Sequence, residues 1–262
     1  PFRLTLMCIY DKIIKNDLRG KCMRETVCVL GVNVDKVNMN EALKRAEDLI
    51  STGGSVFTPN PEIIMKAYEN DSYRDVLNGA DMVIPDGIGV VYGSKILGNP
   101  VPERVAGFDL TCGLLSYAAK NNISVYIYGG KDGVAKKAAE KIHNDFGVNV
   151  CGFEHGYHKD DSGVLKDINE KKPGILLVCL GAPKQENWIA DNKENLPPCL
   201  MIGAGGSVDV LSGQTTRAPK FFLKLNLEWF YRLITEPSRF FRMLVLPKFL
   251  VTVMIHGKKY IK

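Results

Sequence analysis

The sequence predicts an α/β fold in which a mostly parallel, Rossmann-like sheet carries helices on both faces. Short apolar runs alternate with helical patterns from Thr26 onward, and such alternation is typical of βαβ units. Runs such as GILLVCL at 174–180 are apolar throughout, as expected of parallel strands buried on both faces. The apolar content of 45% and charged content of 24% are those of a folded chain.

The expected elements follow one another in a regular order. The predicted strands are 26–31, 55–58, 81–84, 124–129, 148–153, 174–180 and 199–203. The predicted helices lie near 40–51, 61–70, 87–97, 109–121, 131–146, 160–171 and 183–192. In sheets of this kind ligands bind beyond the carboxyl ends of the strands, so candidate site residues should follow strands.

Composition divides the chain into three segments. Residues 1–25 form an N-terminal extension of uncertain role, residues 26–213 form the α/β core, and residues 214–262 form a basic, aromatic, helical C-terminal appendage. Residues 217–262 hold ten Lys or Arg and two Asp or Glu, whereas the rest of the chain holds 24 basic and 27 acidic residues. A basic tail on such a body indicates an anionic partner: membrane lipid, diphosphate or nucleic acid. Pro237 and Pro247 predict short helices with bends in the tail.

Cysteine use indicates a reducing compartment, and hydropathy predicts no membrane-spanning helix. The seven cysteines are scattered without a C-x-x-C pair, which favours reduced core residues over disulfides or a zinc site. No apolar run reaches the roughly 18 residues of a membrane-spanning helix. The N-terminal residues make a poor signal peptide, because Arg3 interrupts a short apolar stretch and no small-residue cleavage site follows.

Two polar motifs each follow a predicted strand and open a helix. In Thr58-Pro59-Asn60-Pro61, the side chains of Thr58 and Asn60 can reach a ligand at the helix N-terminus. The alternative for this motif is an N-cap followed by a proline in the first turn. In Pro85-Asp86-Gly87, Asp86 either caps the next helix or presents a carboxylate suited to general-base catalysis.

Other loops are suited to phosphate. Arg104, in VPERVAG, is either a solvated side chain or a bidentate ligand for a diphosphate. Two glycine-rich turns follow strands, and their backbone N–H groups are either phosphate ligands or parts of plain turns. Their glycines are Gly129 and Gly130 in the first turn and Gly203, Gly205 and Gly206 in the second. Neither turn matches the dinucleotide or Walker A pattern. A third turn, GAPKQE at 181–186, carries a Lys-Gln-Glu cluster that its helix start does not explain.

The sequence predicts no metal and no cofactor. His155 and His158 form an isolated H-x-x-H without a nearby third ligand, so we interpret them as residues that bind no metal.

Seven blocks, in this order, resemble the WecG/TagA/CpsF glycosyltransferase family, from about Val27 to about Lys248. The blocks are GVNVDKVNMNEAL, TPNPEIIMKA, VIPDGIGVVYGSK, PERVAGFDL, GAPKQENWI, GAGGSVDVLSG and LEWFYRLITEPSRFFRM. Residues 1–25 depart from the family pattern as a longer extension than expected.

The resemblance assigns roles to residues at the matching positions. It implies that Thr58 and Asn60 are an active-site polar pair, that Asp86 is the catalytic base, and that Arg104 and Gln185 contact substrate. It also implies that basic residues of the appendage close over the active site at the membrane. These residues are Arg232, Arg239 and Arg242.

The resemblance further implies an inverting transfer of N-acetylmannosamine from its UDP derivative to undecaprenyl-diphosphate-linked N-acetylglucosamine, with a β-1,4 linkage. No D-x-D follows an apolar strand, so we expect metal-independent transfer in which arginines and turn N–H groups meet the charge of the leaving UDP. The alternatives are a UDP-N-acetylmannosaminuronic acid donor, another UDP-sugar, or a nucleotide-binding peripheral membrane protein without catalysis.

The expected partners and location follow from the same resemblance. The partners are the UDP-sugar, the lipid-linked acceptor and an anionic membrane surface that binds the tail. Nucleic acid is not expected, because no nucleic-acid-binding motif is present, and a homo-oligomer is left open. The expected location is cytoplasmic, peripheral on the inner face of the plasma membrane.

Overall fold

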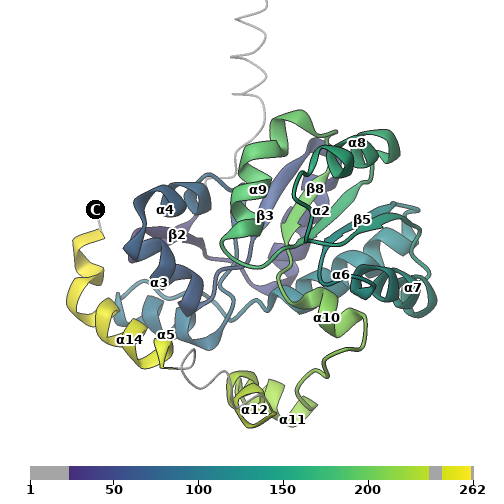
Figure 1. Cartoon of the computed structure of the whole chain (residues 1–262). Helices are drawn as coiled ribbons and strands as arrows, with labels where there is room; N and C mark the ends of the chain where they lie inside the picture. The colour runs from purple at the N-terminus through teal and green to yellow at the C-terminus, as the bar shows by residue number, and fades with distance from the viewer. Residues whose placement is uncertain (1–23, 236–243, 261–262) are drawn as a thin grey trace, which may run out of the picture.

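The computed structural model describes residues 24–235 and 244–260 and confirms the predicted α/β fold (Figure 1). Within these residues, six parallel strands form one sheet in the order β4-β3-β8-β7-β5-β6. The strands are β3 (Gly54–Phe57), β4 (Met82–Val83), β5 (Val125–Gly129), β6 (Val150–Glu154), β7 (Ile175–Cys179) and β8 (Leu200–Gly203). Each lies within two residues of a predicted strand.

Alternation along the buried strands divides the core into two layers. In β7, Ile175 and Leu177 face one layer, whereas Leu176 and Val178 face the other. The remaining strands alternate in the same way, because successive side chains point to opposite faces of a sheet. Both faces are therefore apolar, which explains the continuous apolar runs in the sequence.

Helices cover both faces of the sheet (Figure 1). The first layer is formed by α2 (Met39–Thr52), α6 (Gly107–Lys120), α7 (Val134–Phe146) and α10 (Ser207–Leu211). The second layer is formed by α3 (Pro61–Glu69), α4 (Asp71–Asn78), α8 (Ser162–Lys171) and α9 (Lys184–Asn192), which the 3₁₀-helix η1 (Lys193–Asn195) follows. The sequence analysis did not predict α4 or α10.

The predicted strand 26–31 is instead a hairpin outside the large sheet. Its strands β1 (Thr26–Val29) and β2 (Val32–Asp35) pair antiparallel. Leu30 and Gly31 both have positive φ, 51° and 89°, and so reverse the chain in two residues. A strand was correctly predicted at Thr26–Val29, but the turn at Leu30 and Gly31 and the antiparallel partner β2 were not, because a Leu-Gly turn inside an apolar run is a weak hairpin signal.

A buried carboxylate joins this hairpin to the main sheet. Asp35, at the end of β2, has no exposed surface and accepts a hydrogen bond of 2.6 Å from the backbone N–H of Val83 in β4. Arg24 donates two bonds of 2.7 Å to Asp35, and Arg45 donates a third of 3.0 Å. The hairpin therefore fixes the short edge strand β4, which precedes Asp86 by three residues.

The appendage contains short helices, as predicted. They are α11 (Lys220–Lys224), α12 (Glu228–Thr235), α14 (Val245–His256) and the 3₁₀-helix η3 (Gly257–Tyr260). Pro247 does not divide the tail, because it lies in the first turn of α14, where a proline needs no intrahelical donor. Pro237, Arg239 and Arg242 lie outside the described residues. Among the described helices, none is both long and apolar enough to span a membrane.

Helix α14 packs on α3 and α5 (Ile88–Ile96), whereas α11 and α12 lie at the lower edge of the molecule (Figure 1). Phe249 and Val253 of α14 are fully buried. Gly93 of α5 accommodates the Phe249 ring, because a Cβ at Gly93 would lie 3.1 Å from it. At least one aromatic residue of the tail is therefore a core residue of the body. The boundary predicted at residue 213 stays a prediction.

Replacement of the buried ring should destabilise the whole protein. We expect Phe249→Ala to lower the free energy of unfolding by about 3–5 kcal/mol, because it removes a fully buried ring and leaves a cavity. The matched control is Met254→Ala on the same helix, whose side chain is 56% exposed and should change stability by about 0.5 kcal/mol or less. Urea unfolding measures both, and equal midpoints for the two variants would contradict the packing of α14.

Candidate active site

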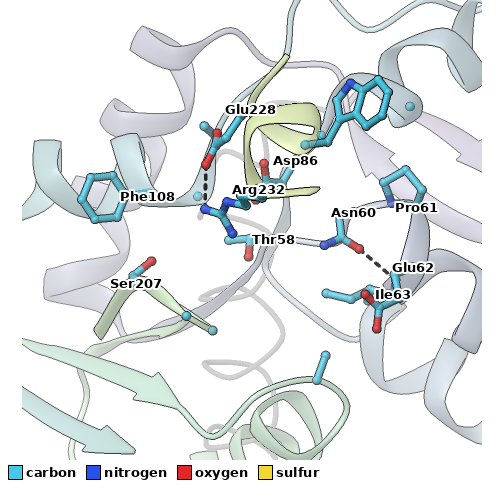
Figure 2. Close-up of a pocket in the computed structure, with 18 of the residues that line it drawn as sticks. Thr58, Asn60, Pro61, Glu62, Ile63, Asp86, Phe108, Ser207, Glu228 and Arg232 are labelled. Carbon is cyan, nitrogen blue, oxygen red and sulfur yellow. Dashed lines mark hydrogen bonds and ion pairs between the residues drawn. The ribbon is translucent and has the colours of Figure 1, made fainter. Parts of the chain in front are cut away.

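A cavity of about 500 Å³ opens beyond the carboxyl ends of four neighbouring strands, β4, β3, β8 and β7. Each strand is followed by a polar or glycine-rich turn that lines it. Thr58 follows β3, Asp86 follows β4, Gln185 lies after β7 and Gly205 lies after β8. Helix α12 closes one side. Figure 2 shows Thr58, Asp86 and Arg232 converging on one space.

Asp86 presents its carboxylate to this cavity and does not cap α5. The N-cap of α5 is Gly87, which makes no side-chain capping bond. The Asp86 carboxylate instead accepts a hydrogen bond from the backbone N–H of Gly107, the first residue of α6. The guanidinium group of Arg104 faces this carboxylate, with its Nε 3.7 Å from Asp86 Oδ1. Asp86 therefore does not cap α5 but bonds to the N-terminus of α6, and its role as the catalytic base stays a prediction.

The environment of Asp86 raises its pKa. Burial is the largest cause, and the positive charge of Arg104 opposes it. The negative charge of Glu228 raises the pKa further, whereas the Gly107 hydrogen bond and Arg232 lower it. A quarter of the side chain is nevertheless exposed, so a ligand in the cavity can reach the carboxylate. A carboxylate with a raised pKa, reachable by a ligand, suits general-base catalysis.

Three charged side chains continue from Asp86 to the appendage. Arg104 Nη2 donates to Glu228 Oε2 over 2.7 Å. Arg232 Nη2 donates to Glu228 Oε1 over 2.6 Å (Figure 2). Although burial opposes ionisation of Glu228, these two arginines hold its pKa below the usual range. The first residue of α12 is thus ionised and bonded to the core.

Thr58 and Asn60 both line the cavity, and both also have structural partners. The Thr58 hydroxyl donates to the Gly203 carbonyl over 3.1 Å, which joins the ends of β3 and β8. Asn60 Oδ1 accepts the backbone N–H of Ile63 over 3.0 Å and so caps α3. The capping interpretation of Asn60 is therefore correct, while the substrate-binding roles of Thr58 and Asn60 stay predictions.

Gln185 shapes the second glycine-rich turn. It is buried; its Oε1 accepts the backbone N–H of Gly205 over 3.0 Å, and its Nε2 donates to Glu186 Oε1 over 2.7 Å. A Cβ at Gly203 would lie 3.0 Å from Gln185 Nε2, so Gly203 allows this close packing. Gly205 and Gly206 line the cavity. The predicted substrate contact of Gln185 stays a prediction beside this observed structural role.

The first glycine-rich turn lies elsewhere. Gly129 and Gly130 are not among the described residues that line the cavity. A Cβ at Gly129 would lie 2.3 Å from the carbonyl oxygen of Cys179, and its φ is +133°. Close contact between the ends of β5 and β7 therefore explains this glycine. Phosphate binding by Gly129 and Gly130 stays a prediction.

The structure adds cavity residues that the sequence analysis did not assign. Glu228 and Trp229 of α12 line the cavity, as does Lys66 of α3, whose ammonium lies 3.4 Å from the Ala182 carbonyl oxygen. An acidic residue four positions before Arg232 was the available signal for Glu228, since such pairs face each other on a helix. Arg239 and Arg242 lie outside the described residues, so their predicted roles stay predictions.

The described residues hold no group of three or more His, Cys, Asp or Glu side chains that could hold a metal ion. His155 and His158 stack with their ring centroids 4.0 Å apart, and His158 Nε2 lies 3.2 Å from Glu154 Oε2. Within the described part of the chain, Glu154, His155 and His158 do not line the cavity.

Comparison with known proteins shows the same similarity that the motifs indicate. Residues 27–261 match the sequence model of the "Glycosyl transferase WecG/TagA/CpsF family". A protein of Bacillus spizizenii (strain ATCC 23059 / NRRL B-14472 / W23), named N-acetylglucosaminyldiphosphoundecaprenol N-acetyl-beta-D-mannosaminyltransferase, is 41% identical over 207 residues, which are 79% of this chain and 80% of that protein. A protein of the same name from Staphylococcus aureus (strain NCTC 8325 / PS 47) is 31% identical over 232 residues, which are 87% of this chain and 91% of that protein.

The raised pKa of Asp86 predicts how stability depends on pH. Because the folded-state pKa lies above the unfolded one, the ionised carboxylate costs folding free energy at neutral pH. That cost disappears as the pH falls below the unfolded value of about 4, where the carboxyl is protonated in both states. We therefore expect Asp86→Asn to melt at a higher temperature than the wild type at pH 7, by a margin that shrinks toward pH 4.

Differential scanning calorimetry at several pH values measures this margin. The control is Asp132→Asn in an exposed turn, where we expect a small change in melting temperature. A variant less stable than the wild type at pH 7, with a gap that narrows on acidification, would show that Asp86 is stabilised by ionisation.

Proposed function

This chain belongs to the WecG/TagA/CpsF glycosyltransferase family, and we propose that it transfers N-acetylmannosamine from UDP-N-acetylmannosamine to undecaprenyl-diphosphate-linked N-acetylglucosamine. The transfer inverts the anomeric centre and forms a β-1,4 linkage. The observation that carries the proposal is the Asp86 carboxylate, which faces the 500 Å³ cavity, has a raised pKa and lies beside Arg104.

In the proposed reaction, a single displacement forms the new glycosidic bond. The acceptor hydroxyl oxygen attacks the anomeric carbon of the donor while the bond from that carbon to the UDP oxygen breaks. The Asp86 carboxylate takes the hydroxyl proton as the oxygen attacks. Burial makes this carboxylate a stronger base than an exposed one, so proton transfer to it is easier. No covalent bond between sugar and protein is needed.

Charge on the departing UDP requires fixed positive groups. Arg104, Arg232 and Lys66 line the cavity together with the turn at Gly205 and Gly206. We propose that these cations and the N–H groups of this turn stabilise the leaving diphosphate without a metal ion, as preorganised donors do in acyl and phosphoryl transfer.

The appendage offers a surface suited to a membrane interface. Phe221 of α11 and Leu225, the residue that follows this helix, are exposed, as are Lys220 and Lys224 of α11. On α12, Phe230 and Ile234 are also exposed. Rings and aliphatic groups at headgroup depth, next to cations that meet anionic lipid, are typical of peripheral membrane binding. We propose that this surface holds the protein on the inner face of the plasma membrane, where its lipid-linked acceptor lies.

Loss of the base should lower turnover without loss of nucleotide affinity. We expect Asp86→Asn to reduce UDP release with a water-soluble acceptor analogue by roughly 10²–10⁴-fold, the usual contribution of general acid–base catalysis. UDP affinity, measured by calorimetry, should stay near the wild-type value, and Asp132→Asn should match the wild type in both assays. Near-normal turnover of Asp86→Asn would exclude Asp86 as the base. A wild type that binds UDP without turnover would support a nucleotide-binding role instead.

Charge reversal on α11 should separate membrane binding from catalysis. We expect the double variant Lys220→Glu, Lys224→Glu to lose co-sedimentation with phosphatidylglycerol vesicles, because each basic residue near an anionic surface contributes about 1 kcal/mol. Its turnover of the soluble acceptor should be retained, since neither lysine lines the cavity in the described structure.

The matched control is Lys136→Glu, Lys137→Glu, which makes the same charge change at exposed positions of α7. Equal loss of vesicle binding in the two double variants would show that net charge, and not this surface, determines binding.

A further inference from the structure

Glu228 is the one buried acidic residue of α12 within the described chain, and it connects two arginines. Its two carboxylate oxygens accept hydrogen bonds from different guanidinium groups. Oε2 accepts one from Arg104 at 2.7 Å, and Oε1 accepts one from Arg232 at 2.6 Å. Arg104 belongs to the loop before α6. Its bond to Glu228 therefore joins α12 to the core on this side of the cavity.

The position of Arg104 depends on this bond. Its Nε is buried and has no hydrogen-bond partner within the described part of the chain. The same atom lies 3.7 Å from Asp86 Oδ1, beyond the 2.7–3.2 Å of a hydrogen bond. A shift of less than about 1 Å would close that gap and satisfy the buried donor. Arg104 is therefore bonded to Glu228 at the expense of a full ion pair with Asp86.

The charges that face Asp86 come from few elements. Arg104 approaches from the loop before α6, and Glu228 and Arg232 approach from α12. The remaining charged side chains that line the cavity lie on α3 and α10. They are Glu62, Lys66 and Asp209. A closed Arg104–Asp86 pair would favour the ionised carboxylate and make it a weaker base.

We infer that Glu228 is a positioning residue: by holding Arg104, it keeps Asp86 out of a full ion pair and so makes the base depend on the seating of α12. The inference rests on the proposed function, because it assigns Asp86 the part of the base. When α12 leaves the core, Glu228 leaves with it, and Arg104 is free to pair with Asp86. The helix that borders the cavity thus controls the availability of the base through one carboxylate.

The test is the pH dependence of kcat/KM for the donor, with a water-soluble acceptor and the full chain. We expect Glu228→Gln to move the acidic limb of the profile down by about 1 pH unit, because a negative charge is lost and Arg104 can close on Asp86. We expect Arg232→Met to move the limb up, because Asp86 loses a positive neighbour while Glu228 keeps its bond to Arg104.

The control is Glu69→Gln, which breaks the 2.8 Å pair with Lys248 that joins α3 to α14. This variant also removes a carboxylate that joins core and tail, but Glu69 is not among the groups that shift the pKa of Asp86. The acidic limb of the pH profile of Glu69→Gln should therefore coincide with that of the wild type. An acidic limb that stays in place in Glu228→Gln, whatever the rate, would overturn the inference and leave Glu228 a purely structural residue.

Two further measurements make the outcome decisive. If Glu228→Gln shows no cooperative melting, Glu228→Asp decides, because it keeps the negative charge but shortens the reach to Arg104, and an unshifted limb in that variant overturns the inference. Titration of the Asp86 carboxyl by ¹³C NMR gives the same comparison without turnover. Absence of turnover in the wild type would contradict the proposed function, whereas turnover with unshifted titrations would contradict only the role of Glu228.

Discussion

Two carboxylates and two arginines in a continuous row join the edge of the sheet to the appendage. Asp86 lies 3.7 Å from Arg104, which bonds to Glu228, which in turn bonds to Arg232. Burial of a charged side chain costs free energy unless a partner of opposite sign lies beside it, so burial of any one of these four side chains alone would be unfavourable. The row therefore requires α12 to lie against the core, and the cavity has its observed wall only while this arrangement holds.

The same row, together with burial, sets the pKa of Asp86. Glu228 lies 2.7 Å from Arg104 and 2.6 Å from Arg232, whereas Asp86 lies 3.7 Å from Arg104 and so has the weaker cationic contact of the two carboxylates. Burial then raises the pKa of Asp86 more than Arg104 and Arg232 lower it. A carboxylate in this state costs stability and gains basicity, which is the usual compromise at a catalytic position.

Support for the site comes from elements far from it in sequence. Asp35 fixes β4 through Val83, and β4 leads to Asp86. Gln185 holds the Gly205 turn through its amide oxygen, while its amide nitrogen bonds to Glu186. Glu186 also accepts the hydroxyl of Tyr73 in α4, a helix that the sequence analysis did not predict. The sheet side of the cavity is thus held by hydrogen bonds between elements, whereas the other side is formed by α12.

The sequence alone determined the parallel sheet and the position of Asp86, Thr58 and Gly205 at its carboxyl edge. Continuous apolar runs specify buried parallel strands, and the turns that follow them must meet at one edge. The antiparallel hairpin at β1 and β2 was decided by the tertiary structure, because its two-residue turn lies inside an apolar run.

Only the tertiary structure decided that Gly129 serves packing against Cys179 and that Glu228 faces Arg104. Both are contacts between residues far apart in sequence, across 50 and 124 positions, and no local pattern encodes which distant partner a glycine or a carboxylate meets.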